Sequence, residues 1–266
     1  IFEFDPLTVK EGKLIAEHPE VDMGSVNYSR KRKVLTVANY TTWKGQRQFL
    51  DKEAENMFKA VEKKLPGYEI AFTSANKAED KYIVATFNDK SRGKRYLYSK
   101  ANNKLDFIAD ISPWLPEAEL ADMKPISYQS RDGLTINGYL TLPKGVAAKN
   151  LPVIVHPHGG PWARDEWRFN PEVQFLANRG YAVFQMNFRG STGYGRKFWE
   201  ASFKQWGKAM QDDVTDGVQW LIKEGVADPK RIGIYGGSYG GYTTLAGITF
   251  TPDLYAAAVD YVGVSN

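Results

Sequence analysis

A serine flanked by glycines follows a short apolar stretch late in the chain, and this feature constrains the fold most. Residues 231–241 read Arg-Ile-Gly-Ile-Tyr-Gly-Gly-Ser-Tyr-Gly-Gly. Gly236, Ser238 and Gly240 fit the Gly-x-Ser-x-Gly pattern of a sharp strand-to-helix turn, the nucleophile elbow. Side chains beside so tight a turn would collide with its neighbours, so glycine is needed on both sides. The pattern predicts that the Ser238 hydroxyl is exposed at the carboxyl edge of a sheet.

The residues around this turn agree with that interpretation. Ile232–Tyr235 predict a strand, and Tyr242–Phe250 predict a helix that ends at Thr251-Pro252. The alternative is an ordinary glycine-rich turn that carries a solvated serine.

An activated serine also needs a base, normally a histidine, and a carboxylate that orients this base. In proteins with this elbow the order along the chain is serine, acid, histidine. The three histidines, His18, His156 and His158, all precede Ser238. We therefore expect the acid and the histidine of the triad to lie beyond Asn266, in a longer polypeptide. An inactive protein is the alternative.

The nearby carboxylates do not fill this gap. Asp253 and Asp260 follow Ser238 but have no histidine to orient. Asp212, Asp213 and Asp216 lie on an expected helix, where solvated or structural ion pairs are the usual role.

Composition excludes several classes of protein. The chain has 266 residues, is 42% hydrophobic and 25% charged, and carries a net charge of +4 spread along its length. This charge does not indicate a nucleic-acid or membrane partner, and Arg30–Lys33 reads as a solvated turn between strands. The chain has no cysteine, which excludes disulfides and thiolate metal sites. The compartment stays open: the cytoplasm is favoured, but the periplasm or secretion is compatible with a chain that starts at Ile1.

Residues 1–118 predict an antiparallel β domain, because short strands recur at even spacing between polar turns. A sandwich or propeller blades of four strands each would fit this pattern. The expected strands are Ile1–Asp5, Lys13–Glu17, Val34–Asn39, Gln46–Leu50, Tyr68–Thr73, Tyr82–Phe87, Arg95–Ser99 and Leu105–Ala109.

One helix, Asp51–Leu65, interrupts these strands and is stopped by Pro66-Gly67. Its apolar residues fall on one face, which predicts packing against the neighbouring sheet. A face that docks a partner is the alternative. The two prolines of Ser112–Pro116 mark a plausible domain junction.

Residues 119–266 predict an α/β domain with a mainly parallel sheet covered by helices on both faces, because strands and helices alternate. The expected elements are a hairpin of Lys124–Gln129 and Thr135–Leu142, strands Pro152–His156, Tyr181–Phe188 and Ala256–Val262, and helices Glu172–Asn178 and Lys208–Lys223.

A second informative segment is His156-Pro-His-Gly-Gly-Pro-Trp162, at the end of an expected strand. Acyl transfer develops negative charge on a carbonyl oxygen, which fixed backbone N–H groups stabilise. In this architecture Tyr239, after the nucleophile, supplies one donor, and the loop after the third strand supplies the other. We nominate Gly160 for the latter and expect His158 to be a scaffold residue of this loop. A zinc site of His156, His158 and Asp165 is the alternative, but no further histidine or cysteine supports a metal.

A glycine-rich loop, Asn187–Gly195, is expected to leave the next strand near the same edge. A nucleotide site is only weakly indicated, because no Gly-x-Gly-x-x-Gly opens a helix here. Arg189 could either hold the loop through a buried carboxylate or face the substrate.

Three motifs in this order, His-Gly-Gly-Pro161, Asn-Phe-Arg-Gly-Ser-Thr-Gly-Tyr-Gly195 and Gly-Gly-Ser-Tyr-Gly-Gly241, resemble the prolyl oligopeptidase family of serine peptidases. The likeness is strongest to its acylaminoacyl-peptidase and dipeptidyl-peptidase-like branch, covers residues 122–266 and extends loosely over 1–118. It implies an α/β-hydrolase domain, truncated after the nucleophile helix and the following strand, preceded by the last one or two blades of a β-propeller.

The resemblance implies a peptidase that hydrolyses short peptides through an acyl-enzyme on Ser238, with Tyr239 and Gly160 as the oxyanion hole. It implies no cofactor and no metal. The partners expected are a short peptide substrate, the remaining propeller blades and the rest of the catalytic domain; the oligomeric state stays open. A carboxylesterase that uses the same site, or a binding module in which the elbow is only scaffold, are the alternatives.

Overall fold

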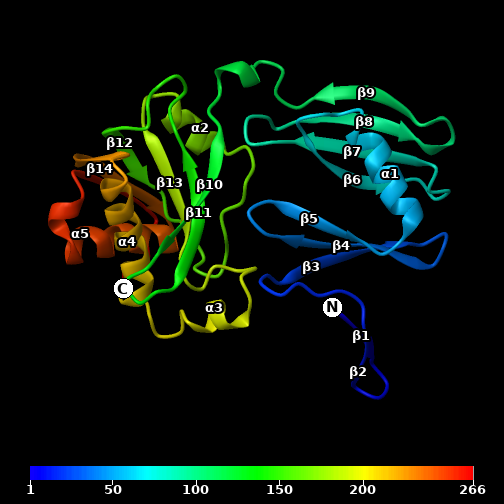
Figure 1. Cartoon of the computed structure of the whole chain (residues 1–266), viewed down its shortest axis with the longest axis horizontal. Coiled ribbons are helices and arrows are strands. Elements are labelled where there is room, and N and C mark those ends of the chain that lie inside the picture. The colour runs from blue at the N-terminus through cyan, green and yellow to red at the C-terminus, as the bar shows by residue number, and fades with distance from the viewer. Residues whose placement is uncertain (266) are drawn as a thin grey trace. The chain divides into compact units, whose positions relative to one another are not determined.

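Residues 1–265 are described by a computed structural model, in which the chain forms two compact units (Figure 1). The first unit is Ile1–Leu115, and the second begins at Pro116. The division falls inside the proline-containing stretch Ser112–Pro116, where a β ladder cannot continue.

The first unit is built from antiparallel sheets. A two-stranded, a three-stranded and a four-stranded sheet follow one another along the chain, in the orders β1-β2, β3-β4-β5 and β6-β7-β8-β9. The strands are β1 (Phe2–Asp5), β2 (Lys10–Leu14), β3 (Met23–Ser29), β4 (Val34–Thr41), β5 (Gly45–Phe49), β6 (Glu69–Ala75), β7 (Lys81–Phe87), β8 (Lys94–Ser99) and β9 (Lys104–Asp110).

Helix α1 (Lys52–Glu62) packs into the core of this unit. The Asp51 side chain accepts a hydrogen bond from the Ala54 N–H and caps the helix. Phe58 and Val61 of α1 are buried in one cluster with Val37 of β4 and with residues of β6, β7 and β8. The apolar face of α1 is therefore used for packing inside the unit and is not available to a partner.

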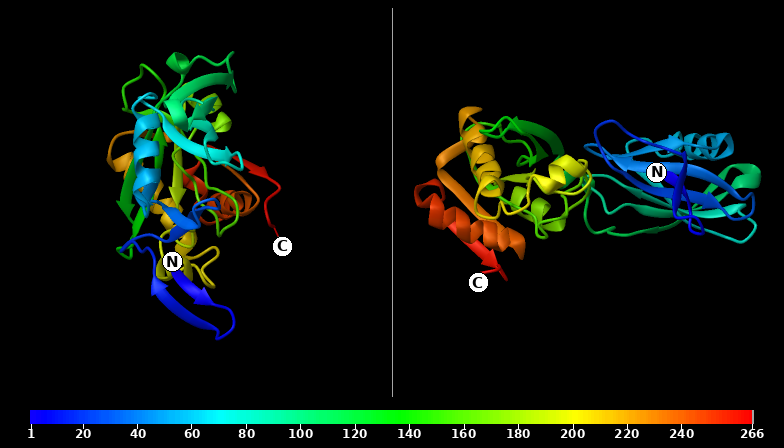
Figure 2. Two further views of the ribbon diagram at one scale, coloured as in Figure 1. Left: turned by 90° about the vertical axis from the view of Figure 1, so that its right-hand side faces the viewer. Right: turned by 90° about the horizontal axis from the view of Figure 1, so that it is seen from below.

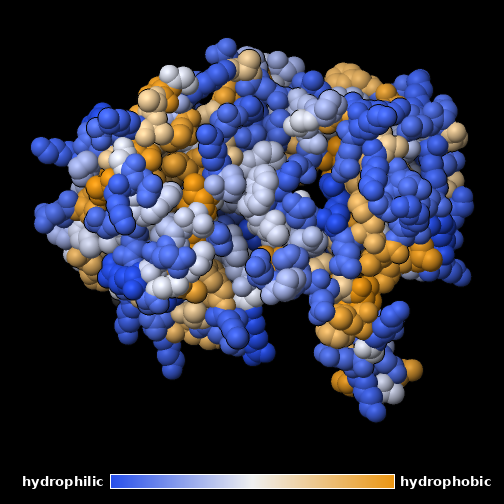
Figure 3. All heavy atoms as spheres, viewed as in Figure 1, coloured by the Kyte–Doolittle hydropathy of each residue, from blue (hydrophilic) through white to orange (hydrophobic). Residues whose placement is uncertain are grey.

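Two surface features of the first unit stand out. Arg32, in the basic turn between β3 and β4, makes two hydrogen bonds to the Asp51 carboxylate of 2.9 and 2.8 Å, and the pKa of Asp51 is lowered mainly by this partner. The β1–β2 hairpin exposes hydrophobic side chains, visible in Figure 3; they are Phe2, Phe4, Leu7, Val9 and Leu14.

The second unit contains one six-stranded mixed sheet in the order β10-β11-β13-β12-β14-β15. Its strands are β10 (Met123–Gln129), β11 (Thr135–Thr141), β12 (Leu151–Val155), β13 (Ala182–Asn187), β14 (Ala227–Gly237) and β15 (Ala257–Tyr261). The β10–β11 and β11–β13 pairings are antiparallel, and the other three are parallel. The expected mainly parallel sheet is thus corrected to a mixed one, because the first hairpin joins it through β11.

Helices cover both faces of this sheet. They are α2 (Pro171–Ala177), α3 (Arg196–Glu200), α4 (Ala209–Lys223) and α5 (Tyr239–Phe250). Val173 of α2 packs with Val183 on one face, whereas Val214 of α4 packs with Phe184 on the other. Figure 2 shows α5 alongside β15 near the end of the chain. Among residues 1–265, no helix has the length and apolar character needed to cross a membrane.

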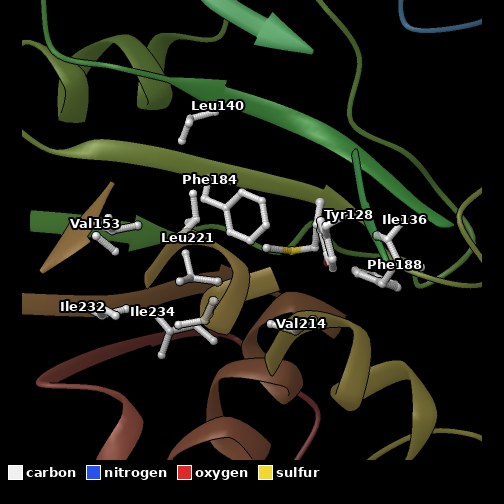
Figure 4. Packing of buried hydrophobic residues seen from close by; sticks show 14 of the residues in the cluster. Tyr128, Ile136, Leu140, Val153, Phe184, Phe188, Val214, Leu221, Ile232 and Ile234 are labelled. Carbon is white, nitrogen blue, oxygen red and sulfur yellow. The ribbon is translucent and has the colours of Figure 1, made fainter. Parts of the chain in front are cut away.

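The main core lies between the sheet and α4 (Figure 4). Phe184 from β13, Ile234 from β14 and Leu221 from α4 are each at most 1% exposed. Burying one such side chain contributes roughly 1.5–3 kcal/mol. This core fixes the carboxyl ends of β12, β13 and β14 side by side, which is where the candidate site lies.

Several element boundaries differ from those expected. Strand β2 spans Lys10–Leu14 where Lys13–Glu17 was expected, and β3 and α3 were not expected at all. Helix α5 begins at Tyr239, three residues before the expected start. Glycines at 240 and 241 disfavour a helix on propensity alone, so contacts with the rest of the unit decide this boundary.

Tight packing around α4 gives a prediction. A Cβ added at Gly217 would lie 2.7 Å from ring atoms of Phe184 and of Tyr128. Gly217→Ala should therefore destabilise the second unit by roughly 1–3 kcal/mol, although alanine normally favours a helix. Gly45→Ala is the control, because nothing lies within 4 Å of its added Cβ. Equal denaturation midpoints for the two variants would contradict the packing described.

Candidate active site

Ser238 occupies the turn between β14 and α5. Its φ of 55° and ψ of −118° lie outside the conformations that non-glycine residues usually adopt. Its N–H donates to the Tyr261 carbonyl at 3.0 Å, and its carbonyl accepts from the Tyr242 N–H at 3.0 Å. Ser238 is also exposed. The turn is therefore a strained backbone, held from both sides, that presents a hydroxyl to solvent, and such strain is concentrated at functional sites.

The elbow glycines lie where no side chain fits. A Cβ on Gly236 would be 2.3 Å from the Gly240 carbonyl oxygen. A Cβ on Gly240 would be 2.2 Å from the Pro157 carbonyl oxygen. The first glycine lets the turn close on itself, and the second lets the 157–159 segment pass against it.

The segment after β12 touches Ser238 directly. A Cβ on Gly159 would lie 3.5 Å from the Ser238 Cβ and 3.2 Å from the Gly237 carbonyl oxygen. Gly160 follows with a φ of +127° and is exposed. Gly159, and not the expected Gly160, is thus the residue beside Ser238, and the run of two glycines in the motif is its only sequence signal.

The backbone N–H groups of Tyr239, which follows Ser238, and of Gly160, which follows Gly159, are without a protein acceptor within residues 1–265. Tyr239 is the first residue of α5, and the N–H groups of a first helical turn have no partner inside the helix. The helix N-terminus also carries a partial positive charge. This arrangement can stabilise negative charge that develops on an oxygen beside Ser238.

His158 fixes the segment after β12 to the loop after β13. Its Nε2 lies 2.9 Å from the Ser191 Oγ, its Nδ1 lies 2.7 Å from the Gly159 carbonyl oxygen, and its ring stacks on Phe188 at 4.3 Å. Burial lowers the pKa of His158 to about 4, so the ring is neutral near pH 7. His158 is thus placed as a support of the loop and is bound away from Ser238.

Asp165 is held by two polar residues of β13. Its N–H donates to Asn187 Oδ1 at 2.8 Å, and Asn187 Nδ2 donates back to the Asp165 carbonyl at 3.1 Å. Gln185 Nε2 donates to Asp165 Oδ1 at 2.7 Å. Burial raises the pKa of Asp165 to about 7. Asp165 Oδ2 and Gln185 Oε1 are buried without a partner among the described residues, and a protonated Asp165 would supply a donor there.

The Arg189 side chain is buried and stabilises the loop after β13. Its side chain is 7% exposed and forms an ion pair with the fully buried Asp213 at 2.7 Å. A second ion pair reaches Asp132 at 2.8 Å. Asp212 and Asp216 pair with Arg131. The three carboxylates of α4 therefore have the structural role expected of them, and Arg189 anchors its loop through a buried carboxylate.

The other histidines have partners elsewhere. His156 Nδ1 lies 2.8 Å from the Tyr235 carbonyl oxygen, and its Nε2 lies 3.7 Å from Glu172 Oε2. The His18 ring lies 4.8 Å from the Tyr40 ring in the first unit, tilted by 33°. Within the part of the chain that the structure describes, no histidine is bonded to Ser238, and no cluster of three or more His, Cys, Asp or Glu could hold a metal.

Close packing at the elbow gives a second prediction. In the full-length protein, Gly240→Ala should abolish labelling of Ser238 by a fluorophosphonate, because the added methyl group collides with the Pro157 carbonyl. Gly237→Ala is the matched control, since its Cβ would meet Tyr261 Cδ1 at 3.4 Å and the Tyr261 carbonyl oxygen at 3.7 Å, both ordinary van der Waals contacts. Labelling is read by mass spectrometry of the intact protein. Equal labelling of both variants would show that the close approach is unnecessary.

The buried side chains of Asp165 and His158 give a third prediction, which concerns how the stability of the fold depends on pH. Asp165 stabilises the fold below pH ~4, and this contribution is lost as the pH rises through about 7. His158 contributes stability above pH ~6.5, and this contribution is lost as the pH falls through about 4. The two effects oppose each other between about pH 4.5 and 6.5, a range that lies between the pKa values of the two groups in the folded protein.

Replacing one of these two groups should therefore reveal the pH dependence that the other group gives to the stability. From pH ~4.5 to ~6.5, Asp165→Asn should gain on the order of 1–3 kcal/mol of unfolding free energy relative to wild type, and His158→Gln should lose a similar amount. Denaturant titrations across this range measure both. Parallel curves for wild type and variants would contradict the pKa directions.

Comparisons with known proteins agree with this geometry. Residues 167–266 match the model of the prolyl oligopeptidase family. The chain is 45% identical over 178 residues to dipeptidyl aminopeptidase BIII of Pseudoxanthomonas mexicana, covering 64% of this chain but 26% of that enzyme.

Solved structures give the same result. A puromycin-hydrolysing peptidase of Mycobacterium tuberculosis superposes with a TM-score of 0.62 at 30% identity, over 70% of this chain and 30% of that one. The acylaminoacyl peptidase of Pyrococcus horikoshii shares the fold over 92% of this chain and 38% of its own, with a TM-score of 0.69 at 22% identity. The chain spans about a quarter to two fifths of these relatives. The stretch that matches the prolyl oligopeptidase family of serine peptidases, residues 167–266, contains Ser238 and its elbow.

Proposed function

We propose that this chain is part of a serine peptidase that hydrolyses short peptides through an acyl-enzyme on Ser238. The observation that carries the proposal is the exposed Ser238 hydroxyl in a strained turn, with the 157–159 segment packed against it. The related dipeptidyl aminopeptidase and acylaminoacyl peptidase support peptides as the substrate class.

In the proposed reaction, Ser238 Oγ attacks the carbonyl carbon of the scissile peptide bond while a base takes its proton. The carbonyl oxygen becomes an oxyanion that accepts hydrogen bonds from the N–H groups of Tyr239 and Gly160, each of which contributes roughly 3 kcal/mol to the transition state. The C–N bond then breaks, and the amine leaves with the proton from the base. Water repeats the sequence on the acyl group and regenerates Ser238.

We propose that the base and its orienting carboxylate come from polypeptide outside residues 1–265. His156 and His158, the histidines of the unit that carries Ser238, are committed to Tyr235 and to Ser191. The short coverage of the relatives, 26% for the dipeptidyl aminopeptidase, leaves room for such a segment. Residues 1–265 alone should therefore bind the carbonyl oxygen but turn over slowly.

We propose that the first unit forms blades of a β-propeller, which admits only short peptides to the active site. The four-stranded antiparallel order β6-β7-β8-β9 is that of one blade, and β3-β4-β5 supplies three strands of another. The shared fold with the acylaminoacyl peptidase, which covers 92% of this chain, supports this arrangement.

The proposal predicts the effect of removing the nucleophile. In the full-length protein, Ser238→Ala should lower kcat on aminoacyl amide substrates by ~10³-fold or more, with unfolding free energy nearly unchanged. Ser127→Ala, at an exposed position of β10, is the control and should retain activity. Activity is followed by release of the amine. Retained turnover without the Ser238 hydroxyl would refute the assignment.

A further inference from the structure

The hydroxyl of Ser191, in the loop after β13, begins a short chain of contacts that reaches the elbow. Ser191 is fully buried, and its Oγ lies 2.9 Å from His158 Nε2. The other ring nitrogen, Nδ1, lies 2.7 Å from the Gly159 carbonyl oxygen. A Cβ on Gly159 would in turn lie 3.5 Å from the Ser238 Cβ. One side chain and one peptide group therefore connect the buried Ser191 hydroxyl to the candidate nucleophile.

The peptide group between Gly159 and Gly160 links His158 to the proposed oxyanion donor. This peptide bond is trans, so the Gly159 C=O and the Gly160 N–H lie in one plane and point in opposite directions. A hydrogen bond that holds the carbonyl therefore also fixes the direction of the N–H. Among residues 1–265, no protein donor other than the His158 ring reaches the Gly159 carbonyl. The direction of the Gly160 N–H thus depends on His158.

The contacts around His158 outnumber the hydrogens that can fill them. Because burial lowers the pKa of His158 to about 4, the ring is neutral near pH 7 and carries one N–H. The Ser191 hydroxyl has one further hydrogen, and its Oγ also lies 2.7 Å from the Phe188 carbonyl oxygen. Three contacts, from Nδ1 to Gly159, from Nε2 to Ser191 and from Ser191 to Phe188, therefore share two hydrogens.

The partners of the two carbonyl groups indicate which contact lacks a hydrogen. The Phe188 carbonyl already accepts the Ser191 backbone N–H at 3.0 Å, so it needs no hydroxyl hydrogen. The Gly159 carbonyl has only the His158 ring. A hydrogen on Nε2 would leave the Nδ1 lone pair facing this carbonyl oxygen at 2.7 Å, with two acceptors opposed. The hydrogen therefore belongs on Nδ1, and the Ser191 hydroxyl is then the donor to Nε2.

We propose that Ser191 is a positioning residue for the reaction: its hydroxyl donates to His158 Nε2 and holds the ring as the Nδ1–H tautomer, which orients the Gly160 N–H toward the oxyanion. This inference rests on the proposed function and adds a residue to it. Without the hydroxyl, the buried Nε2 has no donor and the ring loses one of its two anchors. A misplaced oxyanion donor weakens binding of the transition state and leaves binding of the substrate nearly unchanged.

The first test is a double-mutant cycle in the full-length protein, with kcat and KM measured on an aminoacyl amide. Ser191→Ala should lower kcat about tenfold and change KM less than about twofold. In a His158→Asn background the same substitution should change kcat less than about twofold, because asparagine keeps an N–H donor near the Nδ1 position but has no atom at that of Nε2. Ser112→Ala is the control: Ser112 is also buried, but its hydroxyl has no partner among the described residues.

The second test reads the tautomer of the wild-type protein directly and needs no folded Ser191 variant. Histidine labelled with ¹⁵N is incorporated into the full-length protein, and the ring nitrogens are observed by NMR near pH 7. The His158 signals are assigned by their absence from the His158→Asn spectrum. Nδ1 should carry the hydrogen and Nε2 should be an acceptor. A His158 ring with its hydrogen on Nε2 would overturn the inference.

The outcomes separate this inference from the proposed function. Equal losses of kcat for Ser191→Ala in the two backgrounds would show that Ser191 acts only on its own loop, through the Phe188 carbonyl, and would overturn its positioning role. An unchanged kcat in Ser191→Ala would overturn it too. Fluorophosphonate labelling of Ser238 in the wild type is the independent readout. If Ser238 is labelled, these outcomes refute the role of Ser191 alone. If it is not labelled, the proposed function fails, and the role of Ser191 with it.

Discussion

The site depends on the close approach of two backbones, the elbow around Ser238 and the segment that follows β12. A side chain at Gly240 would overlap the Pro157 carbonyl, and one at Gly159 would crowd the Gly237 carbonyl oxygen. Because glycine has no side chain, the backbone of the strained turn and the backbone of the loop can pack directly against each other. The strain at Ser238 is maintained because hydrogen bonds to Tyr261 and Tyr242 fix the turn on both sides.

Buried polar groups then fix the loops that surround this contact. His158 joins the loop after β12 to Ser191. Asn187 and Gln185, both on β13, hold Asp165. Arg189 ties the loop after β13 to Asp213 of α4. None of these groups is placed to react. They hold the loops around the proposed oxyanion donor, the Gly160 N–H, and a displacement of about 1 Å would weaken such a donor severely. The opposite pKa shifts of His158 and Asp165 arise mainly from the same cause, burial, which disfavours the charged form of each group.

Much of this arrangement was predictable from the sequence, for identifiable reasons. The elbow and the loop after β12 could be predicted because each needs glycines at fixed positions. The apolar face of α1 was visible because it follows the helical period. The start of α5 was misplaced because Gly240 and Gly241 disfavour a helix locally, whereas tertiary contacts impose one. Strand β3 was missed because Gly24, Ser25 and Asn27 give it no strand pattern, and pairing with β4 supplies its stability.

Other parts of the site could not be predicted from one sequence. Arg189 and Asp213 are 24 residues apart, and nothing local indicates that they pair. Gly159 and Gly160 are equivalent in the motif, and only the packing shows which of them lies against Ser238. Trp162 lies beside Trp199 and Phe203, with ring centroids 6.0 and 6.3 Å away, through contacts that have no sequence signature. Polar and aromatic contacts between loops therefore require the structure.

The central claim is that the Ser238 oxygen becomes covalently acylated during turnover. The most direct measurement is rapid acid quench of the full-length protein with an activated ester substrate, followed by mass spectrometry of the peptide that contains Ser238. The account predicts that this peptide gains the mass of the acyl group and loses it again as substrate is exhausted. Turnover with the acyl group on another residue, or with no covalent species at all, would contradict it.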